Sequence, residues 1–461
     1  MLDWVYLAVE RWVRANASRT AKLADYVPLW YVRRLSEVKL LRTLRYVYRK
    51  SPAQRERWSK AGVKLTDLRS PGVLRHIPLT EGVELAEHPE EYICVPEEEL
   101  VHVLTSTGNR TKPKKVYLTA EDLEVHVRMM GTHLRRFPHA TRAAAVFNTD
   151  LPTWSAGTVV RRGIESAGIF GILSHTGRSV PEQIALLKEY QIDALFTMPA
   201  YLHRMTVEAD GNLRELGIHT IHLGGQAWNE EYRAMTEQAW GAKLIDAYGS
   251  MELVCSIASE CMYQSGLHVM EVDFWVEIVD PATGRVLPDG EEGEVVVTTL
   301  SRRGMPLVRY RTHDLAHLID EDERCACGLP LRKMSRVRGR LDDTIIVGGD
   351  ANVYADEWDR ALLAIPGVTD YQVILEKDGY KDVLHLKVEG DTAQRDLPDT
   401  IREAAVSIPN VKIAFATTRT LTIGKIEVLP RGTLSEGRPK ARRVVDKRPS
   451  PTAAQPVRAD D

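Results

Sequence analysis

The sequence predicts an α/β fold, with a large N-terminal α/β domain that contains a β-rich subdomain and a small C-terminal α+β domain. Between residues 143 and 198, short apolar runs alternate with helical patterns. The runs are Ala143–Phe147, Gly168–Leu173 and Ala194–Met198, and Val180–Tyr190 is an example of the helical patterns. This alternation is typical of a doubly wound sheet. From about residue 268 onward, strand patterns follow one another directly.

The β-rich part is predicted from Phe274–Val279, a turn at Pro281–Gly284 and Gly293–Leu300. The small domain combines both patterns. Its expected elements are a helix over Glu357–Ala364, strands over Gln372–Leu375 and Val383–Val388, a helix over Leu397–Ile408 and an alternating, strand-like run over Val411–Phe415. We therefore assign domains to residues 1–341 and 342–446, and a disordered tail rich in Pro, Ala and charge to residues 447–461.

Residues 1–100 read as mostly helical. Leu40, Leu41, Leu44, Val47 and Tyr48 form an apolar stripe. Further along, Thr119 is predicted to cap a helix in which Asp122 is the third residue.

Composition excludes several classes of protein. The 461 residues are 44% hydrophobic and 27% charged, with a net charge of −3, which argues against disorder, a membrane protein and a nucleic-acid-binding protein. The N-terminus places Leu2, Val5, Val9, Trp12 and Val13 at helical spacing but interrupts them with charge, so we expect an amphipathic helix and no signal peptide. No stretch approaches the ~20 apolar residues of a membrane span. A cytoplasmic protein is predicted.

A basic loop stands out between two apolar segments, Val101–Leu104 and Val116–Leu118. It combines hydroxyls, Gly108 and several cations, a composition suited to binding phosphate. A solvated basic turn is the alternative. It is not a Walker loop, because no glycine followed by Lys and Ser or Thr comes after Gly108.

Ligands of a doubly wound sheet bind beyond the carboxyl ends of its strands. Four segments qualify by position: Pro152–Gly157, Met198–Tyr201, Leu223–Trp228 and Ala247–Glu252.

Taken in order, these motifs resemble the adenylate-forming (acyl-CoA synthetase-like) superfamily, and within it the phenylacetate–CoA ligase branch, over roughly residues 95–446. The basic loop is similar to the family's S-S-G-T-T-G-x-P-K, with Asn109, Arg110 and Thr111 as departures. The other similarities are Gly224–Trp228 to G-[AG]-E-P-W, Tyr248–Glu252 to Y-G-x-[ST]-E, Arg309–Leu315 to R-Y-R-T-R-D-L, Gly339–Asp343 to G-R-x-D-D, and Gly432–Leu434 with Lys440–Val444 to the C-terminal segment.

The resemblance implies a mobile C-terminal lid domain, ATP and Mg²⁺ as cofactors, and roles for individual residues. Lys440 would bridge the acyl carboxylate and the α-phosphate, Glu252 would bind Mg²⁺, and Asp342 would be the hinge. The implied ATP-binding residues are Ser106, Thr107, Gly108, Asn109, Arg110, Thr111, Lys114, Gly225, Tyr248, Gly249, Asp314 and Arg340, with Tyr248 on adenine and Asp314 on the ribose hydroxyls. As alternatives, Glu252 and Asp314 are ordinary loop carboxylates and Lys440 is a solvated lysine.

The implied chemistry is physically consistent. A carboxylate is a poor electrophile, and AMP turns its oxygen into a good leaving group. Mg²⁺ at Glu252 and the cation of Lys440 would offset charge in the transition state, and closure of the lid would exclude water.

Four of the five cysteines fall in one part of the sequence. Cys261 and His268 are followed some sixty residues later by Cys325 and Cys327, a donor set that suits tetrahedral, structural Zn²⁺. The resembled branch has a similar arrangement. Free buried cysteines are the alternative, with Cys255 a spare thiol or a competing ligand.

The acyl pocket is expected near Phe147, Trp154, Tyr201, Gly224 and Trp228, whose rings suggest an aromatic or cyclic acid. CoA is the acceptor that the branch implies. The segment Ile345–Val353 departs from the CoA-forming pattern and places Asp350 there, so an amide-forming ligase with an amine acceptor is an alternative. A zinc-containing RNA-binding protein is a remote one. We expect no nucleic-acid or membrane partner and leave a homodimer open.

Overall fold

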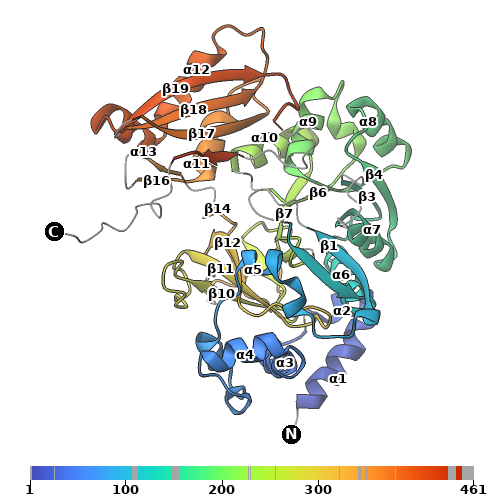
Figure 1. Ribbon diagram of the computed structural model, residues 1–461. Helices are drawn as coiled ribbons and strands as arrows, with labels where there is room; N and C mark the ends of the chain where they lie inside the picture. The colour runs from blue at the N-terminus through green and yellow to red at the C-terminus, as the bar shows by residue number, and fades with distance from the viewer. Residues whose placement is uncertain are drawn as a thin grey trace, which may run out of the picture. The chain divides into compact units, whose positions relative to one another are not determined.

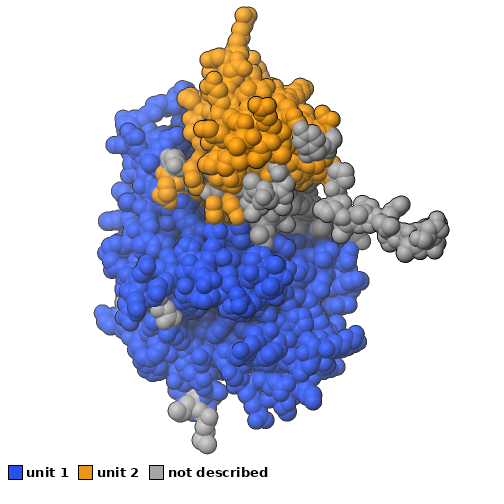
Figure 2. Space-filling model, turned by 90° about the vertical axis from the view of Figure 1, so that its left-hand side faces the viewer, with its two compact units in different colours: residues 1–227, 232–337 blue, residues 228–231, 338–461 orange. Residues whose placement is uncertain are grey.

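The computed structural model describes residues 3–24, 26–105, 113–147, 156–226, 228, 230–254, 256–320, 322–340, 345–347, 351–378, 381–434 and 443–448 (Figure 1). By internal contacts the chain divides into two compact units. The first comprises residues 1–227 and 232–337 and the second residues 228–231 and 338–461 (Figure 2). Neither the predicted boundary at 341/342 nor the hinge at Asp342 is tested, because residues 341–344 lie outside the described ranges.

The chain begins with helices, as predicted: α1 (Asp3–Arg14), α2 (Ala17–Ala24), α3 (Leu29–Lys50), α4 (Pro52–Lys60) and α5 (Gly82–Glu87). In α3, Leu40, Leu41, Leu44 and Val47 are buried, which confirms most of the apolar stripe. In α1 the predicted apolar set does not form one buried face, because Val9 is 42% and Trp12 60% exposed. Periodicity located this helix but not the face that packs. No described helix has the length and apolarity needed to cross a membrane.

The centre of the first unit is an eight-stranded sheet in the order β13-β9-β8-β7-β6-β5-β3-β4. Its strands are β3 (Arg142–Phe147), β4 (Phe170–His175), β5 (Ala194–Thr197), β6 (Thr220–Gly224), β7 (Lys243–Gly249), β8 (Ser256–Ser259), β9 (Leu267–Val269) and β13 (Lys333–Met334). The strands β4, β3, β5, β6 and β7 pair in parallel, and β8, β9 and β13 extend the sheet antiparallel. The parallel part is the predicted doubly wound sheet. Its inner strands β3, β5 and β6 are buried almost throughout, as expected where helices cover a parallel sheet on both faces, whereas the edge strand β4 is largely part-exposed.

Helix α6 (Ala120–Leu134) precedes the first of these strands, and α7 (Ala156–Ser166), α8 (Val180–Glu189), α9 (Pro199–Glu208) and α10 (Glu230–Trp240) connect the parallel ones (Figure 1). The start of α6 confirms the predicted capping box. The Thr119 hydroxyl accepts from Asp122 N, and the Asp122 carboxylate accepts from Thr119 N at 2.9 Å. The same carboxylate also accepts from Arg303 N and Gly304 N, so it joins α6 to the β-rich part of the unit.

The β-rich part contains β10 (Phe274–Val279), β11 (Gly293–Thr299) and β12 (Tyr310–Ala316), which pair antiparallel in that order. The first two agree with the predicted strands to within one residue. A hairpin of β1 (Leu100–Thr105) and β2 (Lys115–Thr119) pairs Thr105 with Lys115. It brings together the two apolar segments that flank the basic loop, whose residues 106–112 lie outside the description.

The second unit is built on the sheet β19-β18-β17-β20, in which β17 and β18 pair antiparallel and both outer strands join in parallel. Its elements are β14 (Gly339–Arg340), β15 (Ile345–Val347), β16 (Ala351–Val353), α11 (Ala355–Leu362), β17 (Asp370–Asp378), β18 (Lys381–Glu389), α12 (Leu397–Ser407), α13 (Pro409–Lys412), β19 (Leu421–Leu429) and β20 (Val444–Asp446). Trp358, Tyr371 and Leu397 belong to its buried core. The α+β prediction holds.

Two expectations for the second unit are wrong. The alternating run Val411–Phe415 is not a strand, because α13 ends at Lys412 and a π-helical turn covers Ile413–Thr417. Short alternating runs cannot separate a strand from a helix face, and here Pro409 begins a helix. The predicted disordered tail also begins too early, since Lys447 N donates to Leu375 O.

Candidate active site

Three predicted segments meet at one edge of the central sheet. Phe147 ends β3, Tyr201 lies in the first turn of α9 just after β5, and Gly224 ends β6. Because β3, β5, β6 and β7 are adjacent and parallel, their carboxyl ends share an edge, and Gly224 pairs with Ala247. The β7 end carries Tyr248 and Gly249. The sheet topology thus brings the predicted adenine and acyl residues of this unit together.

Lys114 and Glu252 form an ion pair across 138 positions of the sequence. Lys114 Nζ donates to Glu252 Oε1 at 2.6 Å and to the Tyr310 hydroxyl at 3.1 Å. Lys114 precedes β2, Glu252 follows β7 and Tyr310 begins β12. The end of the predicted phosphate loop therefore lies beside the predicted Mg²⁺ ligand, and Lys114 also contacts β12 through Tyr310.

Glu252 is 6% exposed, yet its pKa is lowered. Burial by itself would raise the pKa, but the charge of Lys114 and its hydrogen bond favour the carboxylate more strongly. The backbone of Glu252 is held as well, because Arg302 Nη1 donates to its carbonyl oxygen at 2.7 Å. Glu252 is thus held as a carboxylate, the form in which it could bind a hard cation.

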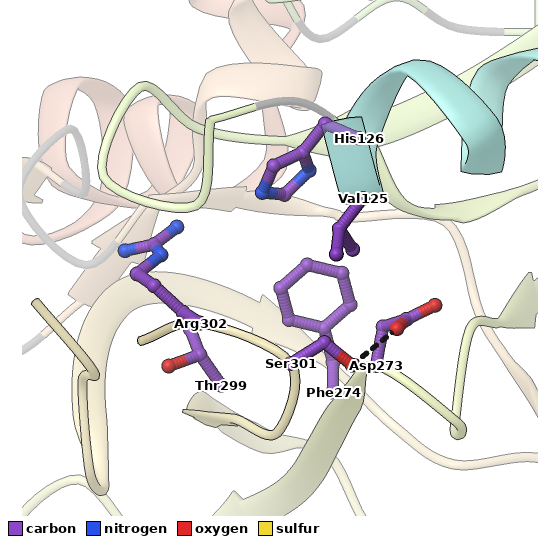
Figure 3. A pocket seen from close by; sticks show the side chains of 7 residues that line it. All are labelled: Val125, His126, Asp273, Phe274, Thr299, Ser301 and Arg302. Carbon is purple, nitrogen blue, oxygen red and sulfur yellow. Dashed lines mark hydrogen bonds between the residues drawn. The ribbon is translucent and has the colours of Figure 1, made fainter. Parts of the chain in front are cut away.

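Arg302 also borders a small cavity next to the site, lined by Val125, His126, Asp273, Phe274, Thr299, Ser301 and Arg302 (Figure 3). Figure 3 shows the His126 ring, the Phe274 ring and the Arg302 side chain around this space. His126 Nδ1 and Arg302 Nε and Nη2 have no hydrogen-bond partner among the described residues. Burial, reinforced by the charge of Arg302, lowers the pKa of His126 to about 3. This histidine is neutral in the folded protein at neutral pH.

Replacement of His126 by Phe is expected to flatten the acid limb of the stability curve. The unfolded histidine titrates near 6.5 and the folded one near 3, so between these values the unfolded state binds the extra proton. Stability attributable to neutral His126 is therefore lost as pH falls below ~6.5, by about 1.4 kcal/mol per pH unit. Urea unfolding at pH 4.5 to 7 measures the slope.

The exposed His88 provides the matched control. His88→Phe should leave the slope as in the parent protein, whereas His126→Phe should reduce it even if its absolute stability also changes. Equal slopes for His126→Phe and the parent would contradict a buried neutral histidine.

Tyr248 and Asp314 form a second pair. The Tyr248 hydroxyl donates to Asp314 Oδ2 at 2.7 Å, which joins the end of β7 to β12. These are the residues expected to contact adenine and ribose. An aromatic ring can stack on a base, and a carboxylate beside it can accept hydrogen bonds from ribose hydroxyls, so the pair suits a nucleoside.

The expected acyl-pocket residues are only partly described. Phe147 and Tyr201 are 8% and 7% exposed, and the Tyr201 hydroxyl has no partner among the described residues. Trp154 lies in the undescribed segment 148–155. Trp228 is buried but belongs to the second unit, so it is not placed with the others.

Cys261, His268, Cys325 and Cys327 come together as predicted. Their ligand atoms all lie within 4.8 Å of one another, with Cys261 Sγ 3.5 Å from Cys325 Sγ and Cys327 Sγ 3.3 Å from His268 Nε2. A hydrogen bond from Cys327 lowers the pKa of Cys261 despite partial burial. A donor set of three sulfurs and one imidazole at these separations fits tetrahedral Zn²⁺, whose ligands lie ~3.3–3.8 Å apart.

Several predicted site residues lie outside the described residues: Ser106, Thr107, Gly108, Asn109, Arg110, Thr111, Trp154, Asp342 and Lys440, and the side chain of Arg340. Conversely, two contacting residues were not predicted. Tyr310 could have been found within the motif that contains Asp314. Arg302 carried no signal, because its role is a contact with the backbone of Glu252.

Two family models match the chain in order. The model of the AMP-binding enzyme matches residues 31–301, and that of the AMP-binding enzyme C-terminal domain matches residues 350–448. The chain belongs to the AMP-binding enzyme family. Relatives place it in the phenylacetate–CoA ligase branch, since it is 31% identical to the phenylacetate-coenzyme A ligase of Thermus thermophilus over 443 residues, 92% of this chain and 98% of the relative. The ligase of the same name from Pseudomonas putida is 28% identical, with coverage of 88% and 92%.

Solved structures give the same fold. A 2-hydroxyisobutyryl-CoA ligase in the postadenylation state, in complex with 2-HIB-AMP, superposes with a TM-score of 0.75 at 22% identity and covers 88% of each chain. An open conformation of that ligase with 2-HIB-AMP and CoA gives a TM-score of 0.65 at 21% identity, covering 91% of this chain and 92% of the ligase. The AMP-binding enzyme described here is thus an adenylate-forming ligase in both sequence and fold.

Proposed function

We propose that this AMP-binding enzyme activates an aromatic or cyclic carboxylic acid with ATP and transfers the acyl group to CoA. The observation that carries the proposal is the linkage of Lys114, Glu252, Tyr248 and Asp314 at one edge of the sheet. Lys114 supplies a cation for the phosphates and Glu252 an anionic ligand for Mg²⁺. Tyr248 supplies a ring for the adenine and Asp314 a carboxylate for the ribose hydroxyls. Phe147 and Tyr201 at the same edge support an apolar, ring-containing acid.

In the first half-reaction, a carboxylate oxygen of the acid attacks the α-phosphorus of ATP, and pyrophosphate leaves with the electrons of the broken P–O bond. The β- and γ-phosphates are bound by Ser106 to Thr111 and Lys114, and the nucleoside by Tyr248, Asp314, Gly225 and Gly249. Lys440 is the cation that approaches both reacting groups. Asp342 is the hinge that brings it there, and Arg340 contacts the nucleotide.

Glu252 would hold the Mg²⁺ ion. When bound, Mg²⁺ neutralises phosphate charge and polarises the phosphoryl oxygens. In the structure, Lys114 Nζ donates a hydrogen bond to the Glu252 carboxylate. If that carboxylate bound Mg²⁺, Lys114 Nζ would be free to contact the phosphates instead.

In the second half-reaction, the CoA sulfur attacks the acyl carbon, AMP leaves, and the thiol proton passes to solvent. CoA is favoured over an amine because the four long relatives are all named phenylacetate-coenzyme A ligases. The amide-forming alternative and the RNA-binding alternative are not favoured.

A mass-spectrometric screen tests the proposal. The enzyme is incubated with ATP, Mg²⁺ and a panel of aromatic, cyclic and aliphatic acids, with CoA and a mixture of amino acids as competing acceptors. We expect AMP and an acyl-CoA, with ring-containing acids preferred. An N-acyl amino acid without thioester would contradict the acceptor, and absence of ATP–pyrophosphate exchange with every acid would contradict the activation step.

The four-residue cluster is proposed as a structural zinc site. All four ligand positions are filled by protein, which leaves none for water or substrate. The site ties β9, which carries His268, to the segment that contains Cys325 and Cys327. Zinc there would stabilise the antiparallel extension of the central sheet.

Purified enzyme is expected to contain about one zinc per chain by elemental analysis. Cys327→Ser removes one ligand and should release most of the metal and lower the melting temperature. Cys94→Ser is the control, because Cys94 is a buried cysteine in the core beside α3 and is not one of the four clustered residues, and it should retain the metal. Metal-free protein, or zinc lost equally in both variants, would contradict the assignment.

A further inference from the structure

Arg443 is a partly buried anchor three residues after the proposed catalytic Lys440. Its Nη1 forms an ion pair with Asp359 Oδ1 in α11, and its Nε lies 3.6 Å from Asp370 Oδ1 at the start of β17. Its guanidinium also lies over the Tyr371 ring, 4.8 Å from the centroid. All of these residues belong to the second unit.

The charged side chains of Arg443, Asp359 and Asp370 are largely shielded from solvent. The side chains of Asp359 and Asp370 are 3% and 17% exposed and that of Arg443 24%, and the Tyr371 hydroxyl donates to Asp359 Oδ1 at 2.6 Å. Burial by itself would lower the pKa of Arg443, but the facing carboxylates raise it. A buried, hydrogen-bonded pair of this kind is costly to break, because one partner would be left as an unpaired charge.

The backbone around Arg443 is fixed as well. Val373 N donates to Arg443 O at 2.7 Å, and β20 continues the pairing with β17 from Val444 onward. Guanidinium and main chain together therefore hold this point of the chain against the core of the second unit.

A second buried carboxylate holds the chain on the other side of Lys440. Glu389, at the end of β18 and 4% exposed, accepts from Gly432 N at 2.9 Å and from Leu434 N at 2.5 Å. Gly432 has φ of 83°, a left-handed conformation that suits glycine. The described residues on either side of Lys440, Leu434 and Arg443, are thus both held against the second unit.

We infer that Arg443, paired with Asp359, is a positioning residue that fixes where Lys440 is presented by the C-terminal domain. The inference rests on the proposed role of Lys440 in adenylate formation. Three residues of chain keep the Lys440 Cα within about 11 Å of the Arg443 Cα. Loss of the anchor frees that end of the segment, and the entropy of ordering it must then be supplied at each turnover.

The test compares Arg443→Met with Lys447→Met. Lys447 is close to Arg443 in sequence but pairs with a different carboxylate, Glu376, in an exposed ion pair at 2.9 Å. ATP–pyrophosphate exchange reports adenylate formation, and thioester formation from supplied acyl-AMP and CoA reports the second step. For Arg443→Met we expect kcat of exchange to fall about tenfold to a hundredfold, with KM for ATP and the supplied-adenylate step within about twofold of the parent. Lys447→Met should behave as the parent protein.

A double variant separates positioning from general stability. If Arg443 acts through Lys440, then Lys440→Ala combined with Arg443→Met should be no slower in exchange than Lys440→Ala alone. Arg443→Lys keeps a cation but loses the planar fork and should be intermediate, which provides a folded variant if the methionine form is unstable.

Three results would overturn the inference. Parent-like exchange by Arg443→Met, together with loss in Lys440→Ala, would refute the anchor and leave the proposed function intact. Additive losses in the double variant, or an equal fall in both half-reactions, would show a purely structural role. Parent-like exchange by Lys440→Ala would refute the proposed role of Lys440 and with it the anchor.

Discussion

Lys440→Ala is expected to lower the kcat of ATP–pyrophosphate exchange by about a hundredfold to a thousandfold, the loss typical of removing one group that stabilises transition-state charge. The carboxylate and the α-phosphate are both anions. The Lys440 cation is the chain's own compensation for their approach. KM for ATP should change little, because the nucleoside and the outer phosphates are bound by other residues.

The second half-reaction is the internal control for this variant. With supplied acyl-AMP, Lys440→Ala should still form acyl-CoA at a rate near that of the parent, because the α-phosphate has already been transferred. Exchange at the parent rate would show that Lys440 is a solvated lysine. Loss of both steps would point to disruption of the domain.

Glu252→Gln is expected to raise the Mg²⁺ concentration needed for half-maximal exchange by about tenfold or more and to lower kcat by about a hundredfold. Glutamine has nearly the shape of glutamate, and the Arg302 hydrogen bond to the residue 252 carbonyl does not depend on the side chain. The change therefore removes the anionic ligand and leaves its support in place. A Mg²⁺ titration of exchange at saturating ATP measures both quantities.

Glu252 also pairs with Lys114, so the Mg²⁺ effect needs a companion variant. Lys114→Met removes the same ion pair but leaves the carboxylate. It should raise KM for ATP without raising the Mg²⁺ requirement. If Lys114→Met shifted the Mg²⁺ requirement as far as Glu252→Gln does, the role of Glu252 would be to orient Lys114, and its assignment as a metal ligand would be wrong.

The Cys/His cluster and the sheet edge that carries Gly224 and Tyr248 differ in how far the sequence could predict them. The Cys and His residues carry rare donor atoms at short spacings, so their meeting was predictable, and the structure brings all four within 4.8 Å. The Arg302 contact with Glu252 was not predictable, because a guanidinium that binds a backbone carbonyl leaves no pattern in the side chains around it. The same holds for the Arg443 anchor, whose partners lie 84 positions away at Asp359 and on β17.

Local patterns in the sequence predicted the fold class, the alternation of strands and helices from Ala143 to Met198, the capping box of α6 and the chemical groups of the site, because each depends on periodicity or on rare residue types. Tertiary structure alone decided which face of α1 packs, that the run from Val411 is helical, and which side chains pair. Lys114 meets Glu252, and Tyr248 meets Asp314, only because the sheet brings distant strand ends to one edge. Contacts of this kind arise from the packing of whole elements, for which no short stretch of sequence carries the information.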